Sequence, residues 1–217
     1  MNPDPDTVLA ERLWNGLSAT DLQVSAEAQR KLIAYVRLLT QWNKVYSLTA
    51  VREPLAMVTR HLLDCLVLLP YLRGDRMADV GSGAGPPGLV LAIARPEQQW
   101  VLLESRLKKA RFLTQALIEL KLDNVSVARE RVEAYQAPIA FSTFTSRGFG
   151  KLPQVFAKVQ TLCRGPATLL VMKGIYPDAE LAELKKSYPD PQVHQLVVPG
   201  LAAERHVVVM HLPGTRA

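Results

Sequence analysis

The stretch from Met77 to Gly88 constrains the fold of this chain more than any other. An apolar run containing Asp79 is followed by four glycines within eight residues, and residues 89–94 are entirely apolar. Glycine has no Cβ, so it tolerates positive φ and lets a ligand approach the backbone closely. The pattern predicts a strand, a tight glycine turn and a buried helix, the arrangement that forms the nucleotide-cofactor crevice of an open α/β sheet.

The spacing of the glycines is compatible with two kinds of cofactor. Residues 83–88 fit the G-x-G-x-x-G spacing of dinucleotide sites, whereas residues 79–85 fit the acid-x-Gly-x-Gly-x-Gly pattern associated with S-adenosylmethionine-dependent methyltransferases. A glycine-rich connection without a ligand is a third interpretation, although few plain loops contain so many glycines. Pro86 and Pro87 lack N–H groups and are predicted to lie in the first turn of the following helix. The glycines alone do not decide between these interpretations.

Composition limits the class of protein and its partners. With 217 residues, 48% of them apolar, the chain is predicted to form one main domain with an accessory segment. The net charge of +6 favours a polyanionic partner, with solubility as the alternative explanation. Two distant cysteines and four scattered histidines predict neither a disulfide nor a metal site. Because no signal peptide or transmembrane run is recognisable, we expect a cytoplasmic protein without a membrane partner.

Helices are predicted before the glycine turn. We expect a helical turn or two within residues 7–24, a helix after the N-cap Ser25, a polar-aromatic connection at residues 41–52, and a third helix over about residues 54–72. We assign residues 1–73 to a helical extension packed on the main domain, which comprises residues 74–217.

Two polar side chains interrupt the third predicted helix just before the sheet begins. His61 and Asp64 are three residues apart, so they lie on the same side of that helix. One interpretation is a surface pair or a buried histidine whose hydrogen bonds are satisfied within the protein. The other is that the pair belongs to a functional site, together with the preceding Arg60.

Strands and helices alternate after the glycine turn, which predicts a mostly parallel sheet with helices on both faces. Strands are expected at residues 100–104, 124–128, 141–145 and 167–172, with helices at 105–122, 150–163 and 177–187. Two further strands, 193–198 and 206–212, are joined by too few residues for a crossover helix and must therefore be antiparallel. A seven-stranded sheet closing with an antiparallel hairpin is typical of the Rossmann-like class I methyltransferase fold and not of dinucleotide-binding domains.

Several short segments extend this interpretation beyond the glycine turn. Residues 42–49, 60–64, 131–133, 146–147 and 172–174 carry Trp-Asn-Lys-Val-Tyr-Ser-Leu-Thr, Arg-His-Leu-Leu-Asp, Arg-Val-Glu, Ser-Arg and Met-Lys-Gly. With the Asp79–Gly88 turn, these segments resemble the RsmG (GidB) family of bacterial small-subunit ribosomal RNA N7-guanine methyltransferases. The resemblance covers about residues 25–212. It implies S-adenosyl-L-methionine as the cofactor and 16S ribosomal RNA or the assembled 30S subunit as the partner. We expect the protein to be a monomer.

The resemblance also implies a set of cofactor contacts on one rim of the sheet. They fall at Gly81 and Pro86 in the turn, at Val132 and Glu133 after the third strand, and at Arg147 after the fourth. Glu104 ends the second strand about 20 residues beyond the turn, where a carboxylate accepts hydrogen bonds from ribose hydroxyls. Arg147 has two possible partners, the cofactor carboxylate and an RNA phosphate, and we favour the cofactor.

Fewer residues are predicted to contact the RNA substrate, which accepts the methyl group. Arg60, His61 and Lys173 are candidate substrate contacts, and Arg106, Lys108, Lys109 and Lys151 are further candidates for phosphates. The basic cluster at residues 106–111 is either a solvated helix face or an RNA contact. Guanine N7 carries a free lone pair, so no general base is required and no catalytic residue is assigned. Two other functions stay open: a non-catalytic ribosome assembly factor and an NAD-type oxidoreductase.

Overall fold

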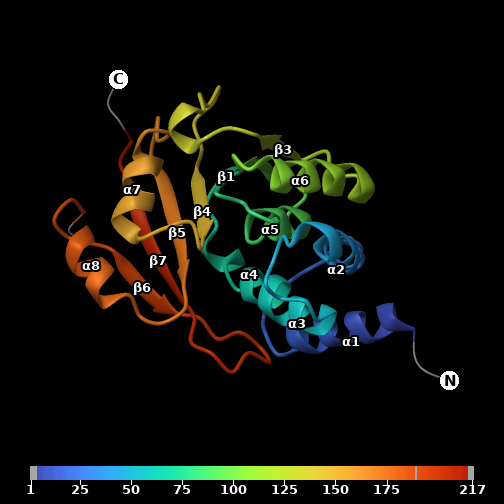
Figure 1. The fold of residues 1–217 in the computed structure, drawn as a ribbon. Helices are drawn as coiled ribbons and strands as arrows, with labels where there is room; N and C mark the ends of the chain where they lie inside the picture. Colours follow the sequence, from blue (N-terminus) through green and yellow to red (C-terminus); the bar gives the residue numbers. More distant parts are fainter. Residues whose placement is uncertain (1–3, 189, 215–217) are drawn as a thin grey trace.

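The computed structural model describes residues 4–188 and 190–214, which form a seven-stranded sheet with helices on both faces (Figure 1). The strand order is β3-β2-β1-β4-β5-β7-β6, and β7 runs antiparallel to both of its neighbours. The predicted class I methyltransferase fold is therefore confirmed, including its terminal hairpin. The strands are β1 (Arg76–Val80), β2 (Gln99–Leu103), β3 (Val125–Ala128), β4 (Thr143–Arg147), β5 (Ala167–Lys173), β6 (Gln192–Gln195) and β7 (His206–Leu212).

The central strand β1 fixes where a ligand can bind. It pairs in parallel with β2 on one side and with β4 on the other, so the direction of winding reverses beside it. Crevices in open α/β sheets form at such a switch point, outside the carboxyl ends of the strands. The glycine turn leaves β1 at this point and enters α5 (Gly88–Ala94).

Helices cover the two faces of the sheet unequally. One face carries α5, α6 (Leu107–Leu120) and the N-terminal helices α1 (Pro5–Ser18) and α2 (Ala26–Tyr46), while α7 (Leu152–Gln160) and α8 (Asp178–Leu184) cover the other (Figure 1). A single buried cluster joins Leu13 of α1 and Leu32 of α2 to Leu91 of α5 and Trp100 of β2. The N-terminal helices therefore share the hydrophobic core of the sheet.

The first two helices are longer than predicted. Helix α1 has 14 residues instead of a turn or two, because Leu9, Leu13 and Leu17 form a continuous buried stripe. The predicted cap of α2 is confirmed, since Ser25 Oγ accepts a hydrogen bond from the Ala28 amide at 3.1 Å. The helix does not end before residue 41 but continues to Tyr46, because Trp42 packs against Phe112 of α6 at a ring distance of 5.6 Å.

The third helical segment begins at Pro54 as predicted but is not one regular α-helix. It consists of a short turn α3 (Pro54–Met57), a π-helical segment η1 (Val58–Leu63), a second turn α4 (Asp64–Leu66) and the 3₁₀ turn η2 (Leu69–Tyr71). A search for α-helical periodicity does not reveal a π segment, and such segments frequently lie at functional sites. Here it contains Arg60 and His61.

Several element boundaries differ from the predicted ones for packing reasons. Strand β4 lies two residues later than predicted, and Thr143–Ser146 are all buried, as in a strand that is covered on both faces. Helix α6 begins at Leu107, two residues later than predicted, and the Leu107 side chain is 43% exposed. Pro86 and Pro87 precede α5 instead of forming its first turn.

Candidate functional site

The glycine turn is held by backbone hydrogen bonds to the neighbouring strand. The amides of Gly81 and Ser82 both donate to the Leu103 carbonyl at 3.0 Å. Gly81 has φ of 72° and Gly83 has φ of 59°, a region that glycine occupies without the strain of a Cβ. The turn is thus fixed against the carboxyl end of β2, with its backbone open to the rim of the sheet.

Glu104 fixes the same turn from the side of α6. Its carboxylate accepts hydrogen bonds from the Gly83 amide at 2.9 Å and from the Arg106 amide at 2.7 Å, and the side chain is buried. A carboxylate has about four lone-pair positions, so these two bonds leave acceptor capacity for a ligand hydroxyl. Glu104 therefore orients the loop and can still receive a ribose.

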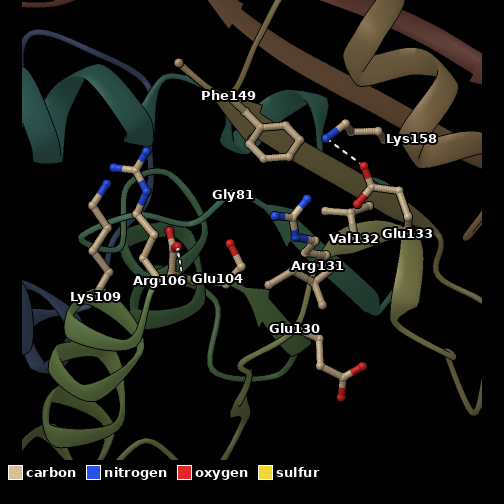
Figure 2. Close-up of a pocket in the computed structure, with 13 residues that line it drawn as sticks. Gly81, Glu104, Arg106, Lys109, Glu130, Arg131, Val132, Glu133, Phe149 and Lys158 are labelled. Atoms are coloured by element: carbon tan, nitrogen blue, oxygen red, sulfur yellow. Dashed lines mark hydrogen bonds and ion pairs between the residues drawn. The ribbon is translucent and has the colours of Figure 1, made fainter.

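A cavity of about 330 Å³ opens beside this turn, within the size range of small-molecule sites. Four of the predicted cofactor residues line it: Gly81, Glu104, Val132 and Glu133. The last two belong to the short 3₁₀ turn η3 (Val132–Ala134) beyond β3. Figure 2 shows Arg106 and Lys109 rising from the start of α6 on one side of Gly81, and Phe149 with Lys158 on the other.

One wall of the cavity is built by residues that sequence reasoning only partly found. Lys158 of α7 bonds to Glu133 Oε1 at 2.7 Å, and its Nζ lies 4.9 Å from the centre of the Phe149 ring. The hydrogen bond from Lys158 holds the pKa of the Glu133 carboxyl below its usual value. The Phe149 ring lies directly over Gly81, where an added Cβ would overlap it. Nothing in the local sequence around Lys158 marks it as a site residue, because α7 reaches the cavity only through the tertiary fold.

Arg147 lies outside the described lining of this cavity. Its Nη1 is 3.0 Å from Asp64 Oδ2 and 3.0 Å from the Arg60 carbonyl, so β4 is tied to the π-helical segment. Asp64 also receives a hydrogen bond from Arg205 Nε at 2.7 Å. We call Asp64, Arg147 and Arg205 the Asp64 ion cluster. Two guanidinium groups share one buried carboxylate, which leaves one excess positive charge on the rim.

His61 has the geometry of a satisfied buried histidine. Its Nε2 lies 3.0 Å from the Thr49 hydroxyl and its Nδ1 lies 3.0 Å from the Arg60 carbonyl. Nδ1 also lies 3.3 Å from Arg147 Nη2, so both ring nitrogens have partners within hydrogen-bond distance. Burial, reinforced by the Arg147 charge, lowers the pKa of His61 to about 4, so the ring is uncharged at neutral pH. The structure therefore buries His61 against Arg60 and Arg147, and its role as a substrate contact stays a prediction.

The depressed pKa of His61 predicts a pH dependence of stability. The unfolded state binds a proton on this ring below about pH 6.5 while the folded state does not until about pH 4, so folding stability falls as pH drops through this window. We expect the free energy of unfolding at pH 5 to be lower than at pH 8 by about 2 kcal/mol from this residue alone. Urea unfolding of the protein and of His61→Gln at both pH values isolates the contribution. Equal pH dependence in the two proteins would contradict it.

Asp79, the acid of the glycine signature, opposes His61 in the same pH range. It is fully buried, its Oδ1 accepts a hydrogen bond from the Thr145 hydroxyl at 2.7 Å, and burial raises its pKa to about 6. Protonation of Asp79 therefore favours the folded state as pH falls, which is why the comparison with His61→Gln is needed. Structurally, Asp79 joins β1 to β4 beneath the turn.

The remaining predicted residues occupy separate places. Lys173 Nζ bonds to Glu180 Oε2 at 2.7 Å and to the Gly150 carbonyl at 3.1 Å, so it holds the loop that carries Phe149. Pro86 is buried and lies outside the described lining of the cavity. Arg60 is exposed on the π-helical segment. The described residues contain no group of three or more His, Cys, Asp or Glu side chains placed to hold a metal ion.

The sheet topology defines the fold as that of class I methyltransferases. Among solved structures, the methyltransferase domain of METTL16 matches with a TM-score of 0.53 and 14% identity, covering 95% of this chain and 91% of that one. An S-adenosylmethionine-dependent O-methyltransferase of Thermotoga maritima matches with a TM-score of 0.52 and 13% identity, covering 82% and 72%. At these identities the likeness is one of fold.

The family follows from closer relatives. The family model described as rRNA small subunit methyltransferase G matches residues 28–208. The Ribosomal RNA small subunit methyltransferase G of Xanthomonas oryzae pv. oryzae is 48% identical over 206 residues, 95% of each protein. The chain belongs to the rRNA small subunit methyltransferase G family, which uses S-adenosylmethionine, and this decides against an NAD-type oxidoreductase. No helix in the described part of the chain is long and apolar enough to span a membrane.

Proposed function

We propose that this protein transfers the methyl group of S-adenosylmethionine to N7 of a guanosine in 16S ribosomal RNA, acting in the cytoplasm as a monomer on the small subunit. The observation that carries the proposal is the convergence of the glycine turn, Glu104 and the Val132–Glu133 turn on one cavity at the switch point of the sheet. Membership of the methyltransferase G family supports the choice of a ribosomal RNA acceptor.

We place the cofactor in this cavity in the orientation that the chemistry of the lining residues favours. Glu104 receives the ribose hydroxyls, and Val132 with Glu133 flanks the adenine, whose exocyclic amine needs an acceptor. Gly81 brings its backbone against the amino acid part, where a side chain would intrude. Pro86 supports the turn from within, and Arg147 acts through the Asp64 ion cluster instead of directly from the cavity wall.

The chemistry requires little from the protein beyond position. S-adenosylmethionine supplies a methyl group on a sulfonium, which is a good leaving group. Guanine N7 holds an in-plane lone pair and no proton in the neutral base, so in-line attack needs no general base. Catalysis then comes from alignment of the two reactants and exclusion of water. Glu133 and Lys158 in the cavity wall are paired with each other, and we assign them no role in proton transfer.

The acceptor base reaches the cavity only after it leaves the RNA stack. Loops and bulges of folded RNA present such unstacked bases, and aromatic side chains hold them by stacking. Phe149 lies at the cavity mouth beside Gly81 and is our candidate for this stacking role. The exposed Arg60 is a candidate phosphate contact, while Lys173 positions the Phe149 loop through Gly150.

The test is transfer of tritium from labelled S-adenosylmethionine to small subunits that lack the modification. We expect label in the 16S RNA of assembled small subunits and none in large subunits, with N7-methylguanosine as the labelled nucleoside. Naked 16S RNA tests whether the assembled subunit is needed as the substrate. Subunits that already carry the modification test whether the label enters the same site. Tight binding of small subunits without any transferred label would identify a non-catalytic assembly factor and overturn the proposal.

A further inference from the structure

We infer that an exposed face at the start of α6 and the end of α2 docks the phosphate backbone of the ribosomal RNA. This α2–α6 face consists of Tyr46, Leu107, Lys108 and Arg111. The inference rests on the proposed function and specifies where its RNA partner lies.

The fold brings the two segments together although they are more than 60 residues apart in sequence. Helices α2 and α6 pack against each other in opposite directions. Trp42, near the end of α2, contacts Phe112 near the start of α6, while Lys31 Nζ lies 3.3 Å from the Lys121 carbonyl at the other end. Tyr46 packs on Trp42 at a ring distance of 5.2 Å, and Lys108 lies one helical turn before Phe112.

The basic residues of this face lie at the end of α6 where acidic residues would stabilise an isolated helix. The amino end of a helix carries a partial positive charge and is stabilised by acids, whereas α6 has no acid in its first turn. Instead Arg106, Lys108, Lys109 and Arg111 lie at or near that end. Among the ion pairs of the described residues, none involves Lys108 or Arg111. Exposed cations that are both unpaired and unfavourable for the helix indicate an external anion.

Exposed apolar and aromatic surface distinguishes this face from a merely solvated one. Tyr46 and Leu107 are each 43% exposed beside the cations. Aromatic rings interleaved with basic side chains are the combination that binds single-stranded RNA, because the rings stack on bases while the cations contact phosphates. A cluster of basic residues alone is compatible with either a solvated helix face or an RNA contact. The exposed Tyr46, which comes from a distant segment, favours the RNA contact.

The face leads directly to the cofactor cavity. Arg106 and Lys109, from the same helix end, line the cavity opposite Phe149 (Figure 2). RNA lying across Lys108 and Arg111 would therefore run toward the cavity mouth, where an unstacked guanine is needed. Because the α2–α6 face continues into the cavity, we assign the RNA backbone to it and not a separate ligand.

The test is the double variant Lys108→Glu/Arg111→Glu. We expect the KM for small subunits to rise by at least about tenfold, with kcat and the Kd for S-adenosylhomocysteine within about twofold of the unmodified protein. The salt dependence of subunit binding should lose about two units of logarithmic slope. The matched control is Lys185→Glu/Lys186→Glu beyond α8, on the other face of the sheet, with the same change in net charge and an unchanged KM expected.

Misfolding does not explain the expected result. Glutamate near the amino end of α6 favours the helix, so the double variant should melt at the same temperature as the unmodified protein or above it. Tyr46→Ala removes the stacking surface without changing charge and should raise the KM by about tenfold. An unchanged KM in the double variant, or an equal rise in the control, would overturn the inference. Because subunit binding is also measured by filter retention, loss of docking is distinguishable from absence of methyl transfer.

Discussion

Gly81→Ala is expected to weaken S-adenosylhomocysteine binding by at least about 100-fold. Gly81 has φ of 72°, in the left-handed region that costs alanine free energy, and its added Cβ would overlap the Phe149 ring. Relief of that overlap requires either the turn or Phe149 to move into the cavity that the cofactor needs. Calorimetric titration with S-adenosylhomocysteine measures the effect.

Gly83→Ala separates steric blockage from backbone strain. Gly83 has a similar φ of 59°, but the nearest atom to its added Cβ is Lys109 Nζ at 3.6 Å, which is ordinary contact. It lies outside the described lining of the cavity. We therefore expect its Kd to change by less than about tenfold, the effect of strain alone. If Gly81→Ala bound the ligand as well as Gly83→Ala does, our placement of the cofactor against Gly81 would be wrong.

Asp64→Ala is expected to cause the largest loss of stability, about 3 kcal/mol in the free energy of unfolding. The Asp64 side chain is 2% exposed and is the shared partner of Arg147 and Arg205. Without it, two partly buried guanidinium groups lose their shared counter-charge, and the links from α4 to β4 and to the loop before β7 are lost. Urea unfolding at neutral pH measures the change.

The exposed ion pair between Asp6 and Arg37 is the control for this prediction. Its atoms are 2.7 Å apart, as close as those of Asp64 and Arg205, but the two side chains are 37% and 57% exposed. Asp6→Ala should cost less than about 1 kcal/mol because water screens such pairs. Removal of one excess charge in Asp64→Ala/Arg205→Ala should recover part of the stability. Equal losses in Asp64→Ala and Asp6→Ala would show that burial of the cluster has no energetic consequence.

The fold was predictable because its signals are local. The glycine turn, the alternation of strands and helices, and the short connection before β7 each depend on neighbouring residues, and all three predictions are confirmed. The boundaries that were wrong depend on tertiary packing. Helix α2 extends to Tyr46 because Trp42 meets Phe112. Strand β4 runs from Thr143 to Arg147, and its first four residues are all buried.

The site was predictable where residues follow directly from strand ends. Gly81, Glu104, Val132 and Glu133 meet in one cavity, as expected of residues on the carboxyl rim of a parallel sheet. Arg147 follows the same rule, yet its side chain turns to Asp64, because the direction of a long side chain depends on partners from distant segments. Lys158 and Arg205 reach their positions only through the fold, and no local pattern marks them.

The most direct test of the account is chemical mapping of the methylated base. Methylation at N7 places a positive charge on the imidazole ring of guanine, so borohydride reduction followed by aniline cleaves the RNA chain at that nucleotide. After incubation of unmodified small subunits with the protein and S-adenosylmethionine, we expect cleavage at one guanosine of the 16S RNA, and none when Gly81→Ala replaces the unmodified protein. Transferred label without a cleavage site would place the methyl group on another atom and contradict the N7 assignment.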